Sequence, residues 1–235
     1  VYMESTGGKL LIVDVENNEF LFEVATGLEY GVRDIVWSPD NKFFAIGNEW
    51  ENKFIIINAE NGDFSNILED QLINGYGGIA WLKTTNQVIT GTGDGKILIW
   101  DLENNTVFKM LEMYDTAVLD LDLSRDGSKL AAIGIRGEIY GWNTENWERE
   151  FILQGTNDYI FPAGLSFSPI GNTLAAFGFL FDNNPLGETR YQVWNTDSQE
   201  LMQEWKYEGL AFNIDYSPDG LLLASSTCDI WDPST

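Results

Sequence analysis

Residues 91–101 read Gly-Thr-Gly-Asp-Gly-Lys-Ile-Leu-Ile-Trp-Asp, a glycine-rich stretch that runs directly into apolar residues. A phosphate-binding loop of the Walker type needs a lysine followed by serine or threonine, and then a helix. Here Lys96 is followed by isoleucine, and residues 97–100 are apolar and prone to form a strand. The stretch therefore predicts a tight turn at Asp94 and Gly95 that leads into a β-strand.

The same kind of strand ending recurs six times along the chain, at intervals of 44, 43, 42, 52 and 37 residues. The endings are Val13-Asp14, Ile57-Asn58, Trp100-Asp101, Trp142-Asn143, Trp194-Asn195 and Trp231-Asp232. Aspartate and asparagine accept backbone amide hydrogens and tolerate left-handed geometry. A hairpin corner is therefore expected after each of the first five endings.

A second series of short alternating strands lies about half a repeat away from the first. Each member closes on a turn rich in Ser, Pro, Asp or Gly and is followed by another apolar run. The members are 35–40, 79–84, 121–126, 165–170 and 214–219. Units of about 40–45 residues with four strands each are typical of β-propeller blades.

These motifs resemble the WD-repeat family. Ser-Pro-Asp-Gly follows the innermost strand at 217–220, with near copies at 38–41, 124–127 and 168–171, and Trp-Asp or Trp-Asn ends the third strand. The resemblance covers nearly the whole chain and implies an all-β fold, a β-propeller of four-stranded antiparallel blades. Four complete and two partial repeats are expected, which gives five or six blades or a fragment of a seven-bladed parent.

Residues 1–235 are expected to form a single WD-repeat-like propeller domain, incomplete at both ends. The first unit lacks an innermost strand, and the last unit lacks an outermost strand. The chain begins at Val1 within what is predicted to be a strand, which suggests a segment excised from a larger multidomain chain.

The chain departs from the family pattern because it contains no histidine. The resemblance implies a histidine nine residues before the anchor of the innermost strand, where Tyr114 and Tyr207 precede Leu123 and Tyr216 by that distance. A tyrosine there is expected to fill an apolar gap with its ring and to donate one hydrogen bond.

Tyrosines also stand in all five loops between repeat units. They are Tyr30, Tyr76, Tyr114, Tyr159 and Tyr207. They either pack between blades or form an aromatic rim that binds peptide or sugar. The interval of 52 residues contains an insertion at 179–189 on the same end, where Phe179 and Phe181 pack onto the neighbouring blade or contact a partner.

Four aspartates lie on the innermost strands, on the face opposite the anchor residues. They are Asp34, Asp120, Asp122 and Asp215. Converging carboxylates of this kind suit a glycoside hydrolase or a calcium site. The structural alternative is that each one binds an amide of the neighbouring blade or water in the channel.

Composition narrows the classes of function. The 13 basic and 37 acidic residues give a net charge of −24, which repels a phosphate backbone, so a nucleic-acid partner is not expected. Insertion into a membrane is not expected either, because the chain has no run of about 18 apolar residues. Because Cys228 is the only cysteine and histidine is absent, zinc sites and Cys-His or Ser-His-Asp nucleophiles are excluded. No cofactor or resident metal is expected.

The sequence therefore predicts a non-catalytic interaction scaffold that binds a protein or peptide partner through one propeller face, with the tyrosine rim and the 179–189 loop as contacts. The alternative is a carbohydrate-active or calcium-binding propeller that uses the inner-strand carboxylates. A regulatory sensor module of a larger parent chain is a third hypothesis.

Overall fold

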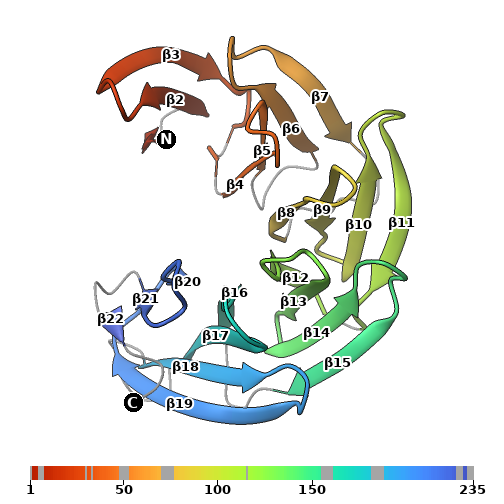
Figure 1. Ribbon diagram of the computed structural model, residues 1–235, viewed down its shortest axis with the longest axis vertical. Helices are drawn as coiled ribbons and strands as arrows, with labels where there is room; N and C mark the ends of the chain where they lie inside the picture. The colour runs from red at the N-terminus through yellow and green to blue at the C-terminus, as the bar shows by residue number, and fades with distance from the viewer. Residues whose placement is uncertain are drawn as a thin grey trace. The chain divides into compact units, whose positions relative to one another are not determined.

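The computed structural model describes residues 2–4, 8–29, 31–32, 34–47, 53–69, 77–114, 116–154, 161–180, 188–225 and 230–231. Every regular element in these ranges is a β-strand, and none of them contains a helix long and apolar enough to cross a bilayer. Figure 1 labels the strands in order along the chain. They fall into two compact units, residues 1–110 and 111–235.

The first unit contains three antiparallel sheets in chain order. The first sheet is β1 (Tyr2–Glu4), β2 (Lys9–Asp14) and β3 (Glu19–Ala25). The second is β4 (Asp34–Trp37), β5 (Phe43–Gly47), β6 (Lys53–Asn58) and β7 (Phe64–Glu69). The third is β8 (Ile79–Leu82), β9 (Gln87–Gly91), β10 (Lys96–Asp101) and β11 (Thr106–Glu112), whose last two residues belong to the second unit.

The second unit repeats this arrangement with three further sheets. Its first sheet is β12 (Val118–Leu123), β13 (Lys129–Gly134), β14 (Glu138–Asn143) and β15 (Arg149–Gln154). The second is β16 (Phe161–Phe167), β17 (Thr173–Leu180), β18 (Glu188–Asn195) and β19 (Glu200–Glu208). The third is β20 (Ile214–Tyr216), β21 (Leu223–Ser225) and β22 (Ile230–Trp231).

The sheets confirm the predicted repeat pattern. The described residues form four four-stranded and two three-stranded sheets, as expected for four complete and two partial repeats. Strand β2 ends at Asp14 as β10 ends at Asp101, so β1 to β3 correspond to the second to fourth strands of a complete sheet. The last sheet has the first three strands in its described part.

The stretch 91–101 forms the hairpin that its sequence predicts. Strand β9 ends at Gly91, and β10 begins at Lys96. The Gly95 amide donates to the Thr92 carbonyl at 3.2 Å, and Gly95 adopts φ 84°, a left-handed conformation that glycine adopts without a steric penalty. Lys96, the lysine of the glycine-rich stretch, pairs with the Asp94 carboxylate of the same turn at 2.5 Å.

The hairpin corners after the third strands also form as predicted. In each corner the Asp or Asn side chain that ends the third strand accepts amides two or three residues further on, as Asp101 does from Glu103 and Asn143 does from Glu145. The residue four positions after that Asp or Asn adopts the left-handed backbone conformation. These residues are Asn18, Gly62, Asn105, Trp147 and Gln199.

Apolar side chains pack between successive sheets inside each unit. In the first unit one cluster joins the first two sheets around Leu10 and Ile55, and another joins the second and third around Ile56 and Trp81. In the second unit equivalent clusters join its three sheets. Because the middle strands β5 and β6 contribute side chains to both clusters of the first unit, nearly all of their residues are buried.

Two of the repeated tryptophans differ in how their indole nitrogens are satisfied. Trp100 Nε1 donates to Thr90 Oγ1 at 2.9 Å, and Thr90 lies two residues after the strand partner of Trp100. Ala176 takes the equivalent position opposite Trp194. Trp194 Nε1 is buried and has no hydrogen-bond partner among the described residues.

We therefore expect Ala176→Ser to supply the missing acceptor and to raise the free energy of unfolding by about 1 kcal/mol, the usual net value of a buried hydrogen bond. Urea denaturation of the purified chain measures the change. Ala175→Ser is the matched control, because Ala175 is equally buried and packs in the cluster on the opposite face of β17. This control should lower stability, and an equal loss in both variants would contradict the assignment.

Candidate functional site

Each sheet of the second unit has two chemically different ends. One end carries the loop that leads into the first strand and the turn between the second and third strands, and we call it the loop end. The opposite end carries the turns between the first and second and between the third and fourth strands, and we call it the turn end. The antiparallel strand order places these connections in this way in every sheet.

Only part of the predicted tyrosine rim lies in the described residues. Tyr114 is 66% exposed in the loop before β12, and Tyr207 is 38% exposed near the end of β19. Tyr30, Tyr76, Tyr159 and Phe181 lie outside the described residues. The interpretation of Tyr114 as a buried replacement for the family histidine is wrong, because its ring faces solvent instead of filling an apolar gap.

Phe179 forms part of an aromatic cluster at the loop end of the second unit. Its ring lies 5.9 Å from that of Phe177 and 6.4 Å from that of Phe212. Phe179 is partly buried against the cluster that joins the last two sheets, whereas Phe212 is 76% exposed. Phe179 therefore packs against the apolar cluster between the last two sheets, and its ring also contacts the exposed ring of Phe212.

We call Phe179, Tyr207, Leu210 and Phe212 the loop-end patch. Phe179, Thr189 and Tyr207 lie opposite one another on β17, β18 and β19. The buried Thr189 hydroxyl donates to the Gly209 carbonyl at 2.6 Å and accepts the Ala211 amide at 3.2 Å. These two bonds hold the loop 209–212 against the sheet, so the exposed Leu210 and Phe212 are presented from a fixed backbone.

Phe212 is not among the site residues predicted from the sequence. It lies between β19 and β20, next to the buried Ala211 and before the strand that begins at Ile214. The sequence contains one indication of its exposure. Phe212 is a large aromatic residue in a short connection, beside Asn213, and it does not continue the apolar–polar alternation of the strand before it or of the strand after it. Its contact with Phe179, more than thirty residues away in sequence, depends on the packing of the two sheets.

Three of the four inner-strand aspartates bridge neighbouring sheets. Asp34 Oδ2 accepts the Ile79 amide at 2.9 Å in the first unit. In the second unit Asp120 Oδ2 accepts the Leu165 amide at 3.0 Å, and Asp122 Oδ2 accepts the Phe167 amide at 2.7 Å. Each bond spans 45 residues in sequence, and each Oδ1 accepts the amide of the residue that follows its own aspartate.

Asp215 differs from these three aspartates. It is exposed, and its carboxylate accepts the Ser166 hydroxyl at a long 3.4 Å. Among the described residues no group of three or more His, Cys, Asp or Glu side chains is placed to hold a metal ion. Nothing in the geometry of these carboxylates favours the carbohydrate-active or calcium-binding alternative over their role as acceptors between sheets.

The aspartates of the Ser-x-Asp turns are electrostatically distinct. The Ser38 hydroxyl and the Lys42 amide donate to Asp40, and these hydrogen bonds lower the pKa of Asp40 below its ordinary value. The Ser128 amide and the Ser124 hydroxyl lower the pKa of Asp126 in the same way. The repeated turn therefore stabilises a negative charge through local donors.

Comparison with known protein families finds one match inside the chain. The family described as "WD domain, G-beta repeat" matches residues 75–101, which end on Trp100 and Asp101. This segment includes strand β8 and the hairpin formed by β9 and β10.

Curated relatives extend the likeness to most of the chain. Periodic tryptophan protein 2 of Arabidopsis thaliana is 23% identical over 235 residues, covering 96% of this chain and 24% of that protein. Protein HIR1 of Cryptococcus neoformans is 25% identical and covers 63% of this chain and 18% of its own length. A BTB/POZ domain and WD-repeat protein of Acanthamoeba polyphaga mimivirus is 25% identical, covering 97% and 44%. The chain thus spans less than half the length of each of these relatives.

A solved structure shares the fold. Kuenenia stuttgartiensis hydrazine synthase matches with a TM-score of 0.71 at 16% identity, covering 82% of this chain and 54% of that one. At this level of identity the likeness concerns the fold alone. Together with the antiparallel sheets it confirms the predicted class, an all-β propeller fold built from four-stranded blades.

The bridging role of Asp122 predicts a loss of stability when its carboxylate is removed. Asp122→Ala leaves the amides of Leu123 and Phe167 without their acceptor, and we expect the free energy of unfolding to fall by about 2–3 kcal/mol. The matched control Asp215→Ala should change it by less than about 0.5 kcal/mol, because that carboxylate is exposed and weakly bonded. Equal effects in urea denaturation would refute the bridge.

The turn aspartates predict a specific dependence on pH. Because the folded state lowers the pKa of Asp40, its stabilisation is complete above the unfolded value of about 3.9 and is lost as the pH falls through the folded value. Asp40→Asn should therefore melt at a lower temperature than the wild type at pH 7, and the difference should shrink as the pH falls below the unfolded value and the folded carboxylate takes up its proton. A difference that stays constant across this range, measured by circular dichroism, would contradict the prediction.

Proposed function

We propose, on the premise that this chain is a member of the WD-repeat family, that it is a non-catalytic scaffold that binds a protein or peptide partner through the loop end of its sheets. In this view the chain works by surface complementarity and makes or breaks no bond. The tyrosine rim and the 179–189 loop of the sequence hypothesis are part of the proposed surface.

The observation that carries the proposal is the loop-end patch. Phe212 exposes 76% of its surface while its ring contacts Phe179. Leu210 is exposed in the same loop, and Tyr207 is exposed on β19 opposite Thr189, the strand partner of Phe179. Water disfavours such a group of neighbouring apolar side chains, and aromatic residues are enriched where protein surfaces meet. The two hydrogen bonds of Thr189 order the loop in advance, which reduces the entropy that binding costs.

The charge of the second unit supports a particular kind of partner. Residues 111–235 contain six Lys and Arg side chains against twenty Asp and Glu side chains. An acidic surround attracts basic groups and repels phosphate backbones. We therefore infer a partner that inserts an apolar side chain at Phe212 and places lysine or arginine residues around it.

The relatives support a role inside a larger protein. The mimivirus protein combines WD repeats with a BTB/POZ domain, and all three relatives are much longer than the aligned segment. We propose that this chain likewise functions as one part of a multidomain protein and supplies its partner-binding surface.

Quantitative affinity purification from the native source tests the scaffold. Phe212→Ser should reduce recovery of the specific partner at least about tenfold, because truncating an exposed aromatic anchor commonly costs 1–2 kcal/mol or more of binding energy. The matched control Phe108→Ser changes an aromatic residue that is 60% exposed on the outer strand β11, and it should retain the partner.

Both variants should melt within about 2 °C of the wild type, since neither removes a buried side chain. Mass spectrometry then compares the proteins recovered with wild type, Phe212→Ser and Phe108→Ser. A partner that is recovered equally by all three would place the binding surface elsewhere and contradict the proposal for this end.

A further inference from the structure

Strand β3 forms the outer edge of the first sheet. The sheet has the order β1-β2-β3, and among the described residues no strand pairs with the outer side of β3 (Figure 1). A free edge presents backbone N–H and C=O groups that can pair with another extended chain. We propose that this edge binds an extended segment of a protein partner as an added strand, and that the segment carries lysine or arginine next to apolar residues.

Two other outer strands show how such an edge is covered in this chain. Asn105 Nδ2, in the corner between β10 and β11, donates to the Ile67 carbonyl of β7 at 3.3 Å. Gln199 Oε1, in the corner between β18 and β19, accepts the Ile152 amide of β15 at 3.5 Å. Asn105 and Gln199 are the left-handed residues of their corners. The corner of one sheet thus covers outward backbone groups of the preceding sheet.

Glu23 of β3 takes the position that Ile67 and Ile152 take in β7 and β15. Each of these three residues is the second one after the β-bulge of its strand, and they lie opposite Leu11, Ile55 and Tyr140. Since Ile67 and Ile152 direct their backbone groups away from the neighbouring strand of their sheet, so does Glu23. The Glu23 amide and carbonyl therefore point to the open side of β3.

The corner that follows β3 does not supply a cover. Its left-handed residue is Gly62, with φ 78°, which has no side chain. A Cβ atom at Gly62 would lie 2.9 Å from Val24 Cγ2 and 3.0 Å from Phe22 Cε2, so a larger residue would displace these two side chains. Close packing between the two sheets therefore favours glycine here, and it leaves the backbone groups of Glu23 without a corner side chain.

The bulge of β3 exposes apolar side chains where two other outer strands have polar ones. Leu21 is the bulged residue and is 50% exposed, and Phe20 beside it is 60% exposed. The bulged residues of β7 and β15 are Ser65 and Glu150. Charged side chains at such positions normally protect an edge strand from pairing. The bulge of β3 lacks this protection, and Phe20 and Leu21 offer contact to an apolar side chain of the added strand.

Charge identifies the other side chains of the segment. Residues 2–29 contain six Asp and Glu side chains and one basic side chain, Lys9, which pairs with Glu23 at 2.6 Å. Glu16 in the turn before β3 and Glu19 at its start are both exposed. An acidic edge attracts lysine and arginine. A second copy of this chain is disfavoured, because it would set β3 against an equally acidic strand, and like charges on facing strands are destabilising.

This site does not depend on the proposed function. Every residue that would contact the added strand lies in the first unit, whereas the loop-end patch lies in the second. Phe212→Ser should therefore leave binding at β3 unchanged, and a failure of either proposal leaves the other one testable.

A phage-displayed library of random linear peptides is the probe. The library is first depleted on immobilised Glu23→Pro protein and is then selected on the wild type. Proline at position 23 removes the outward amide and blocks an added strand, and it spares the bonds between β2 and β3 because that amide points away from β2. We expect the enriched peptides to combine Lys or Arg with Val, Ile, Leu or Phe and to lack proline.

Synthetic copies of the enriched peptides should bind Glu23→Pro at least about tenfold more weakly than wild type by fluorescence anisotropy, and added salt should weaken their binding to the wild type. Ile67→Pro is the matched control, because it places proline at the same position of β7. It should bind the peptides within about twofold of wild type, as should Phe212→Ser. Thermal melts check that all variants are folded.

Phe20→Ser gives a second comparison that leaves the backbone of β3 unchanged. It should weaken binding at least about threefold, because it removes an exposed aromatic contact. Phe64→Ser should keep the affinity of the wild type, since Phe64 takes the equivalent position on β7.

Two readouts distinguish an added strand from charge attraction alone. Methylating one alternate set of backbone nitrogens in the peptide should abolish binding, while methylating the other set should largely preserve it, because an added strand uses one of its two edges. Hydrogen exchange measured by NMR should show that the peptide slows exchange of the Glu23 amide. No enrichment after depletion, equal losses in Glu23→Pro and Ile67→Pro, or equal effects of the two methylation sets would each overturn the proposal.

Discussion

The bond between an aspartate carboxylate on the first strand of one sheet and a backbone amide on the first strand of the next sheet organises each unit. First strands are edges of their sheets, so their outward amides lack a ladder partner. Asp34, Asp120 and Asp122 supply that partner from the preceding sheet, and each bond spans one repeat of 45 residues. The apolar clusters behind these strands provide most of the stabilisation, and the carboxylates set how one sheet lies against the next.

Repetition of the sequence does not make the two ends of the sheets alike. At the turn end the same Ser-x-Asp chemistry recurs in three sheets, where Ser38, Ser124 and Ser217 each donate to the aspartate two residues further on. At the loop end the connections differ in length and composition. The aromatic contact between Phe179 and Phe212 occurs there because the connection between β19 and β20 lies against the end of β17. A regular scaffold with variable loops is the arrangement by which repeat proteins present distinct surfaces.

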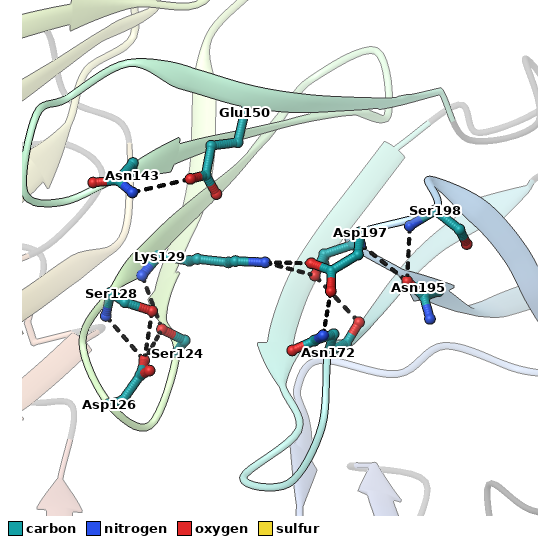
Figure 2. Close-up of polar contacts among 11 residues, drawn as sticks. Ser124, Asp126, Ser128, Lys129, Asn143, Glu150, Asn172, Asn195, Asp197 and Ser198 are labelled. Carbon is teal, nitrogen blue, oxygen red and sulfur yellow. Dashed lines mark hydrogen bonds and ion pairs between the residues drawn. The ribbon is translucent and has the colours of Figure 1, made fainter.

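The loop-end patch follows from this difference. It is apolar and offers rigid aromatic surface on a unit with twenty acidic and six basic side chains. The turn end is polar by contrast, because the carboxylate of Asp126 accepts hydrogen bonds from Ser124 and Ser128 and that of Asp197 pairs with Lys129 (Figure 2). An acidic unit of this kind discriminates between partners by charge as well as by shape.

The sequence by itself determined the strands, the hairpin corners and the number of sheets, because these depend on residues within a few positions of one another. The hairpin from Val88 to Trp100 is an example, because the alternation of its residues, the Asp-Gly turn and the closing Trp-Asp pair all predict the same two strands. Only the tertiary structure decided the roles of single side chains. Tyr114 faces solvent, Phe212 reaches Phe179, and Lys129 bridges to Asp197 because sheet packing brings together residues far apart in the chain. Local pattern encodes which strand forms, whereas the distance between neighbouring sheets decides which side chains meet.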